Sequence, residues 1–200
     1  MQPFKNFTGL VAPMDRSNVD TDQVIPKQFL KAVVRSGLGK GLFFDWRNQP
    51  DKGYVLDEPR FKGASILVAR ANFGCGSSRE HAVWALMDYG FAAVLSPRFA
   101  DIFRNNSSKM GLVVAPIDAD AIHKLWEAIE EDPNLEIVVD VENKRVAAPA
   151  VGIDVPFELD DFTQHRLLNG LDDIGLTLQH GDNIAAFEQT RPTHKPAVSR

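Results

Sequence analysis

A glycine-rich turn carries the residues of this chain that are best suited to chemistry. The segment from Asn72 to His81 reads NFGCGSSREH. Its two glycines let the backbone turn tightly and approach a ligand closely, and Arg79 can bind a carboxylate through two parallel hydrogen bonds. If a helix begins here, its first N–H groups have no partner within the helix and favour an anion. The turn therefore predicts a site for a small anionic ligand.

The same residues also allow a purely structural interpretation. Ser77 and Glu80 have the spacing of a capping box, in which the serine accepts a backbone hydrogen bond and the glutamate reaches back. Spacing alone does not separate this interpretation from a ligand site. The turn matches neither a Walker sequence nor Gly-x-Gly-x-x-Gly, and a nucleophile elbow requires Gly-x-Ser-x-Gly. A nucleotide site or a serine hydrolase is therefore poorly supported.

The elements on either side place the turn at the edge of a parallel sheet. Residues 65–71 form a short apolar run with β-branched members, which predicts a buried strand. Residues 78–90 follow as an amphipathic helix that ends at Gly90, and residues 91–96 predict a second buried strand. This order predicts a parallel pair joined by a right-handed crossover. The turn then lies where α/β sheets bind their ligands.

The rest of the sequence completes a mixed α/β domain. Residues 15–26 are dense in Asp, Asn and Ser and end at a proline, which is typical of a turn. A short helix is predicted from residue 97 to about Asn105 and Asn106, and an amphipathic helix at 118–133. Further strands are predicted at residues 7–14, 111–117, 134–141, 145–150 and 152–159.

The C-terminal part reads as a helical extension of one domain. Residues 160–189 predict two or three short helices that are broken at glycines 170, 175 and 181. No long linker divides the chain, so residues 1–189 are expected to form a single domain that includes this extension. Residues 190–200 combine two prolines with small and basic residues, which predicts a flexible tail.

Composition excludes several classes of protein. The chain has 200 residues, 44% of them hydrophobic, and a formal net charge of −5 with scattered Lys and Arg. This distribution gives no basic face for a nucleic acid. No apolar run approaches the roughly 20 residues of a membrane span, and the polar start does not resemble a signal peptide. We therefore expect a cytoplasmic protein with no membrane segment.

The cysteine content limits the metal chemistry of the chain. Cys75 is the only cysteine, so an intramolecular disulfide is impossible and a reducing compartment is expected. An iron–sulfur cluster or a structural zinc site needs about three or four thiolates or imidazoles. The five histidines show no close metal-binding spacing. Any metal that the chemistry needs is therefore expected on another chain.

Four blocks of sequence resemble the swivelling domain of the aconitase superfamily. Residues 72–82 (NFGCGSSREHA) resemble its signature, residues 18–26 (NVDTDQVIP) its Asp-Thr-Asp segment, and residues 99–106 (FADIFRNN) its next helix. Residues 166–177 (RLLNGLDDIGLT) are similar to the C-terminal extension of bacterial isopropylmalate isomerase small subunits. Four blocks in the right order are far more specific than any one of them. The resemblance covers roughly residues 4–188 and implies an α/β fold, a swivelling β/β/α domain.

This resemblance implies the small subunit of a hydro-lyase. Members of the family reversibly dehydrate hydroxy-dicarboxylates and hydroxy-tricarboxylates. For this branch the implied reaction converts 2-isopropylmalate into 3-isopropylmalate through 2-isopropylmaleate, a step of leucine biosynthesis. The family holds a [4Fe-4S] cluster on larger domains, so the cofactor is expected on a large partner subunit. The chain would then act on a small dicarboxylate only within that heterodimer.

The resemblance also implies roles for individual residues. Ser77 matches the catalytic base, which acts as an alkoxide, and a helix N-terminus with Arg79 beside it suits an oxyanion. Arg79 matches the carboxylate-binding arginine, and Ser78 matches a residue that helps to hold the substrate. A supporting role is expected for Gly74, Cys75, Gly76, Glu80, His81, Asp20, Thr21 and Asp22.

Recognition of the substrate's alkyl group is expected within residues 27–41, where the family varies. Phe29, Leu30, Val33 and Val34 could cover an isopropyl group. The alternative is that these residues pack in the core or face the partner. An apolar pocket distinguishes one methylene by only about 1–3 kcal/mol, so related substrates are expected to react as well.

Two other functions stay open from the sequence. The first is the small subunit of a related hydro-lyase, such as homoaconitase or a citraconate/methylmalate hydratase, because the 166–177 extension does not identify the substrate. The second is a non-catalytic binding or regulatory protein that uses the swivelling fold. The presence of both Ser77 and Arg79 argues against this second function.

Overall fold

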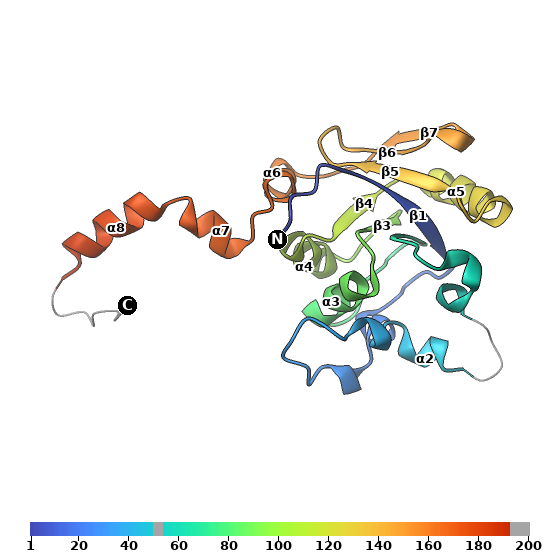
Figure 1. Ribbon diagram of the computed structural model, residues 1–200, viewed down its shortest axis with the longest axis horizontal. Coiled ribbons are helices and arrows are strands. Elements are labelled where there is room, and N and C mark those ends of the chain that lie inside the picture. The colour runs from blue at the N-terminus through green and yellow to red at the C-terminus, as the bar shows by residue number, and fades with distance from the viewer. Residues whose placement is uncertain (50–53, 193–200) are drawn as a thin grey trace.

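One seven-stranded sheet organises the chain (Figure 1), whose structure is a computed structural model that describes residues 1–49 and 54–192. The strands lie in the order β4-β3-β2-β1-β5-β6-β7. All the strands predicted from the sequence are present, mostly one to three residues shorter at their ends. They are β1 (Asn6–Met14), β2 (Ile66–Ala69), β3 (Ala93–Ser96), β4 (Val113–Pro116), β5 (Glu136–Asp140), β6 (Arg145–Ala148) and β7 (Ile153–Pro156).

Strand β1 joins a parallel half of the sheet to an antiparallel half. Strands β1 to β4 run parallel, so the predicted parallel pair β2 and β3 is confirmed. Strands β1, β5, β6 and β7 pair antiparallel, and β5 with β6 forms the predicted hairpin. Figure 1 shows the sheet curling, so that β5 to β7 lie as a layer above β3 and β4, with helices α3 and α4 below. This is the predicted β/β/α arrangement.

Eight α-helices and five one-turn 3₁₀ helices are present in the described residues. The α-helices are α1 (Thr21–Val24), α2 (Phe44–Arg47), α3 (Glu80–Tyr89), α4 (Asp101–Met110), α5 (Ala119–Glu131), α6 (Asp161–Asn169), α7 (Asp173–Leu178) and α8 (Gly181–Thr190). The 3₁₀ helices are η1 (Lys27–Phe29), η2 (Gly39–Gly41), η3 (Val55–Asp57), η4 (Pro59–Phe61) and η5 (Pro149–Val151).

The core lies between the sheet and its helices. Every residue of β2 and β3 is buried, as expected for central strands covered on both faces. Helix α5 is capped by Asp118 and buries the predicted stripe, which includes Leu125 and Ile129. The Trp126 indole in that stripe donates a hydrogen bond to the Val68 carbonyl oxygen at 3.2 Å. This bond satisfies the buried indole N–H and fixes α5 against β2.

Helix α4 and the 15–26 segment differ from their predictions. Helix α4 was expected to end near Asn105 and Asn106, yet it continues to Met110 and ends where Gly111 takes a φ of 94°. Phe103 and Ser107 are buried four residues apart on its inner face, and their packing carries the helix across the asparagines. Residues 15–26, expected to be a turn, contain the single-turn helix α1.

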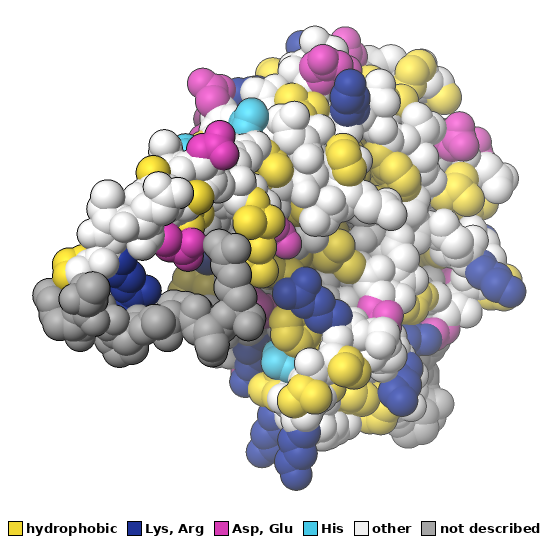
Figure 2. Space-filling model, turned by 60° about the vertical axis from the view of Figure 1, so that its left-hand side comes forward, with side chains coloured by type: hydrophobic (Ala, Val, Ile, Leu, Met, Phe, Trp, Pro, Cys, Tyr) yellow, Lys and Arg dark blue, Asp and Glu magenta, His cyan; other side chains and the backbone are white. Residues whose placement is uncertain are grey.

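The C-terminal extension consists of three helices. Gly170 takes a φ of 64° and ends α6 as predicted. The break predicted at Gly175 is wrong, because that glycine lies inside α7 and donates its N–H to the Asp172 side chain at 2.7 Å. Helices α7 and α8 stand off the body (Figure 1, Figure 2). Helix α8 runs to Thr190, so most of the tail predicted at residues 190–200 lies outside the described residues.

None of the helices in the described part of the chain combines the length and the apolar character that crossing a membrane requires.

Candidate active site

The turn from Asn72 to Arg79, called the serine turn below, lies at the edge of the sheet where the parallel strands end. It follows β2, and the neighbouring segments that follow β1 and β3 meet it through two isolated parallel bridges. One bridge pairs Asp20 with Cys75, and the other pairs Phe73 with Phe99. Three of the four sequence blocks quoted for the resemblance are thus joined by backbone pairing.

Backbone hydrogen bonds hold the turn in this position. The Gly74 N–H donates to the Val19 carbonyl oxygen at 2.8 Å, and the Thr21 N–H donates to the Cys75 carbonyl oxygen at 2.9 Å. Gly74 has a φ of 76° and Gly76 a φ of 89°, a region that favours glycine. A Cβ added at Gly74 would overlap the buried Phe103 ring. This position therefore requires glycine for two reasons: its backbone has a positive φ, and a side chain would overlap Phe103.

Ser77 is exposed and is held by a residue from another part of the chain. The buried Thr21 hydroxyl donates a hydrogen bond to the Ser77 carbonyl oxygen at 2.8 Å. The side-chain oxygens of Thr21 and Ser77 are 3.3 Å apart. Sequence reasoning gave Thr21 only a general supporting role. The structure makes it the direct neighbour of the serine that was predicted to react.

The capping box that the spacing of Ser77 and Glu80 allows is not formed. Helix α3 begins at Glu80, its N-cap residue is Arg79, and no side chain caps it. Ser77 therefore lies two residues before the N-cap, and its polar groups face Thr21 instead of the helix N–H groups. Glu80 is exposed in the first turn of α3.

A capping box is present one segment away, at the start of α1. The Asp20 carboxylate accepts from the Gln23 N–H at 2.8 Å, and the Gln23 side chain accepts from the Asp20 N–H at 3.0 Å. Asp20 and Gln23 have the spacing of this motif, so the box is predictable from the sequence. The box orients α1 and so positions Thr21 against the serine turn.

Arg79 is paired with Asp22 across the turn. The Arg79 Nη1 atom donates to the Asp22 Oδ1 atom in a close ion pair. The Arg79 side chain is 18% exposed and that of Asp22 is 56% exposed. The Arg79 side chain is therefore mostly covered and only partly accessible from solvent. Ser78 is also exposed on this turn.

Cys75 lies half-buried between the two glycines. Burial raises the pKa of its thiol above the ordinary value, and the negative charge of Asp20 acts in the same direction. The protonated thiol is therefore the main form at neutral pH, and a thiolate nucleophile is not favoured here.

His81 lies behind the turn and contacts the 27–41 segment. Its Nε2 atom is 3.1 Å from the Ala32 carbonyl oxygen, and its ring centroid is 4.6 Å from that of Trp84. Farther along the same segment, the Gly39 N–H donates to the Asp88 carboxylate at 2.7 Å. Helix α3 thus carries the serine turn at its start and holds the 27–41 segment along its side.

The four residues proposed for substrate recognition fall into two pairs. Phe29 and Leu30 are partly buried against the core, and the Phe29 ring makes an edge contact with Phe44 at 5.2 Å between centroids. Val33 is 92% exposed and Val34 is 58% exposed. The two valines are therefore the more accessible pair for a ligand or a partner.

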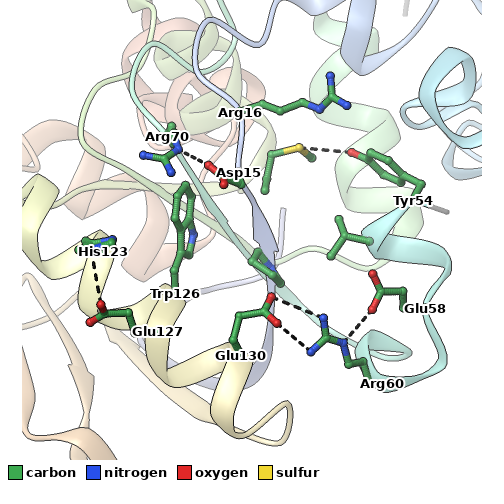
Figure 3. A pocket seen from close by; sticks show the side chains of 13 residues that line it. Asp15, Arg16, Tyr54, Glu58, Arg60, Arg70, His123, Trp126, Glu127 and Glu130 are labelled. Carbon is green, nitrogen blue, oxygen red and sulfur yellow. Dashed lines mark hydrogen bonds and ion pairs between the residues drawn. The ribbon is translucent and has the colours of Figure 1, made fainter. Parts of the chain in front are cut away.

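A separate hollow of about 660 Å³ opens between the end of β1 and helix α5 (Figure 3). Most of its charged side chains pair with each other: Arg60 lies between Glu58 and Glu130, and Arg70 is bound to Asp15. The described residues that line it include none from the serine turn. We therefore place the candidate site at the exposed turn.

The described residues do not gather a metal site. No group of three or more His, Cys, Asp or Glu side chains lies close enough together within residues 1–49 and 54–192 to hold an ion.

Comparisons with known families agree with this arrangement. The family model described as the aconitase C-terminal domain matches residues 1–120. A second model, which describes the C-terminal domain of the 3-isopropylmalate dehydratase small subunit, matches residues 173–199. The first match contains the serine turn and α1, and the second contains all of α7 and α8.

Curated relatives match the chain over almost its whole length. It is 52% identical over 198 residues to a 3-isopropylmalate dehydratase small subunit from Kocuria rhizophila, covering 99% of this chain and 98% of the relative. A protein of the same name from Rubrobacter xylanophilus is 48% identical over 198 residues, covering 99% of this chain and 100% of the relative. A third, from Acidothermus cellulolyticus, is 53% identical over 198 residues, with 99% and 98% covered.

A solved structure supports the fold. The crystal structure of 3-isopropylmalate dehydratase from Methanocaldococcus jannaschii superposes with a TM-score of 0.68 at 22% identity. The superposition covers 90% of this chain and 98% of that one. The chain therefore belongs to the family of 3-isopropylmalate dehydratase small subunits, and its fold is the swivelling domain of the aconitase superfamily.

Proposed function

We propose that this chain is the small subunit of an enzyme that converts 2-isopropylmalate into 3-isopropylmalate through 2-isopropylmaleate, in leucine biosynthesis. The observation that carries the proposal is the exposed Ser77 hydroxyl beside Thr21, on a turn that also presents Arg79. The chain is also about half identical, over almost its full length, to proteins named 3-isopropylmalate dehydratase small subunit.

Ser77 is proposed as the base that removes a proton from carbon during dehydration. The single Thr21 hydroxyl proton points to the Ser77 carbonyl oxygen at 2.8 Å. In the contact between the two side chains, at 3.3 Å, Ser77 is then the donor. Its lone pairs are left for a substrate proton on the exposed side. The base is the alkoxide form, in which Ser77 has released its own proton to solvent; the alkoxide then takes the substrate proton and becomes the neutral hydroxyl again. Nearby positive charge stabilises such an oxyanion.

Arg79 is proposed to bind a substrate carboxylate, with Ser78 beside it. A guanidinium has five N–H donors, and the pair with Asp22 uses the Nη1 side of the group. The remaining donors can form the two parallel hydrogen bonds that suit a carboxylate. In this role Asp22 is a positioning residue, because it fixes the direction of the guanidinium without contacting the substrate.

The residues of this chain do not fit a [4Fe-4S] cluster. Such a cluster is held mainly by cysteine thiolates, and the chain has one cysteine, half-buried between two glycines. We propose that the cluster is carried by a large partner subunit and that it supplies the Lewis acid for the departing hydroxyl. The small subunit is then inactive alone, and the open turn is its half of a shared site.

Val33 and Val34 are proposed to cover the substrate's isopropyl group. They are exposed on the 27–41 segment, whereas Phe29 and Leu30 form the packed base beneath them. The contact of His81 with the Ala32 carbonyl oxygen fixes the backbone next to Val33. Substrate preference and the serine turn are then linked through helix α3.

The proposal includes the domain boundaries and the cellular location. Residues 1–189 are proposed to work as one domain, because α6 packs on the body and the N-terminus contacts its end. A cytoplasmic location suits the free thiol of Cys75 and an iron–sulfur partner, since both need a reducing compartment.

The test is reconstitution with the large subunit, followed by turnover assays on several hydroxy acids. We expect 2-isopropylmalate to give the highest kcat/KM. A preference for homocitrate or citraconate would instead support the related hydro-lyases. A complex that forms but turns over none of these acids would favour a binding or regulatory protein.

A further inference from the structure

We propose that α7 and α8 form a second docking element, which binds an apolar groove with a basic rim on the large subunit, away from the active-site edge. Residues 171–190, which contain these helices, are called the C-terminal arm below. The proposal rests on the proposed function for the existence of the large partner. It goes further by assigning a contact that the catalytic turn does not make.

The C-terminal arm exposes large apolar side chains in a helical pattern. Ile174 and Leu178, four residues apart in α7, are 70% and 68% exposed. Ile184 and Phe187, three residues apart in α8, are 37% and 61% exposed. Figure 2 shows hydrophobic side chains along the arm where it leaves the body. These spacings place each pair on one helix face, and such clustered exposure marks an interaction site.

The two helices have no packing partner in the described part of the chain. No residue of α7 or α8 is buried, and both stand off the body in Figure 1. Helix α7 has 6 residues and α8 has 10. Helices shorter than about 12–15 residues are marginal in water unless an apolar face is packed. The apolar faces of the arm are therefore left unpacked by the described part of the chain, and a surface that covers them would stabilise both helices.

The base of the C-terminal arm is fixed by polar contacts. The Arg166 side chain is only 6% exposed; its Nε donates to the Leu171 carbonyl oxygen at 3.3 Å. Its Nη2 lies 2.9 Å from the Asp173 carboxylate as an ion pair, without the geometry of a hydrogen bond. The Met1 ammonium donates to the Gly170 carbonyl oxygen at 3.2 Å. The first residues of the arm are therefore held on the body before any partner binds.

The arm leaves from the edge of the sheet opposite to Ser77. Met1 contacts Gly170 and also lies over Gly111, which closely precedes β4. Because β1 to β4 are parallel, all of them begin at this edge and end at the other. Ser77 follows the end of β2. A partner that meets Ser77 therefore meets the arm at a second, distant contact.

Charge and family both indicate which molecule binds the arm. Residues 171–190 contain four acidic side chains and no Lys or Arg: Asp172, Asp173, Asp182 and Glu188. The arms of two copies would repel each other, so pairing of arms between copies is disfavoured.

A family model specific to small subunits matches residues 173–199, and the similar small subunits are covered to 98–100% of their length. The arm is thus present in proteins whose name, small subunit, implies a larger partner. Its acidic residues are complementary in charge to basic residues around an apolar groove on that partner.

The two contacts would have different roles, one in binding between the subunits and the other in the reaction. Once the arm is bound, the serine turn meets its partner as an intramolecular event at a raised effective concentration. The arm then contributes to the affinity between the subunits, and the serine turn contributes to turnover.

The experiment compares Leu178→Asp and Phe187→Asp with Val151→Asp, an equal change at an exposed valine of the body. Each full-length variant is titrated into the purified large subunit, and both Kd and kcat at saturation are measured. We expect the arm variants to raise Kd at least about 10-fold, as for central interface residues. The kcat at saturation should stay within about twofold of the wild type, and Val151→Asp should change neither value.

Several results would overturn the proposal. An unchanged Kd in both arm variants would do so, and so would an equal rise in Val151→Asp. If the variants abolished self-association of the small subunit and left the Kd for the large subunit unchanged, a second copy would be the true partner. Ser77→Ala gives the opposite pattern, with a low kcat and a normal Kd, so failure of the proposed chemistry is distinguishable from failure of the docking element.

Discussion

The side-chain oxygens of Thr21 and Ser77 lie 3.3 Å apart, although 56 residues separate them in the sequence. Thr21 belongs to the single-turn helix α1, which the Asp20 and Gln23 capping box holds in place. The position of the proposed base therefore depends on a second segment of the chain, and not on the helix that follows it.

Thr21→Val should reduce catalysis without unfolding the protein. Valine keeps the shape of the buried side chain but leaves the Ser77 carbonyl oxygen and hydroxyl without their neighbour. One hydrogen bond contributes about 0.5–1.5 kcal/mol, so kcat/KM should fall roughly 2- to 10-fold. Steady-state kinetics of the reconstituted enzyme check this, with Thr21→Ser as the control that retains the hydroxyl. Equal losses in both variants would contradict the role of the hydroxyl.

Arg79→Lys should damage substrate binding although the charge is retained. An ammonium cannot form the two parallel hydrogen bonds of a guanidinium. A hydrogen bond to a charged group contributes about 1.5–3 kcal/mol, which predicts a loss of roughly 10- to 150-fold in kcat/KM. The matched control is Arg98→Lys, because Arg98 is an exposed arginine that follows the neighbouring strand β3. Near-normal kcat/KM in Arg79→Lys would exclude the assigned role.

In the 27–41 segment, the exposed pair Val33 and Val34 should respond to truncation differently from the packed pair Phe29 and Leu30. Val33→Ala should change the ratio of kcat/KM values between 2-isopropylmalate and a smaller hydroxy acid, with little change in Tm, because Val33 is 92% exposed. Phe29→Ala should lower Tm, because its ring packs on the core and on Phe44. A change of selectivity in Phe29→Ala alone would reassign the recognition surface.

Gly74→Ala should destabilise the protein more than Gly63→Ala. Both glycines have positive φ values, 76° and 86°, and alanine costs about 1–2 kcal/mol in that region. A Cβ at Gly63 meets open space, whereas one at Gly74 overlaps the Phe103 ring. Overpacking adds about 1–3 kcal/mol. Chemical denaturation of the two variants measures the difference, and equal free energies of unfolding would show that Phe103 moves aside easily.

Much of the fold could be predicted because local patterns and tertiary packing agree. The apolar runs of β2 and β3 and the stripe around Leu125 and Ile129 of α5 are buried as their periodicity indicates. Gly90 and Gly170 end α3 and α6 with positive φ values, as glycine at a helix end predicts. These signals depend on residues close together in the sequence, so one chain is enough to read them.

The points that the sequence leaves open depend on contacts between distant segments. Ser77 and Glu80 have the spacing of a capping box, but Thr21 engages Ser77 and the helix begins at Glu80 instead. The separation of Phe29 from Val33 likewise depends on which side of the 27–41 segment faces the core. Helical spacing places such residues near each other but does not identify the buried side.

The most direct test of the central claim is the kcat of Ser77→Ala in the complex with the large subunit. Removal of a general base typically costs about 10²- to 10⁴-fold, so kcat should fall by that factor while the Kd between the subunits stays unchanged. The neighbouring Ser78→Ala variant should retain much more activity. A Ser77→Ala complex with normal kcat would contradict the account, because no other hydroxyl is placed against Thr21 in the described residues.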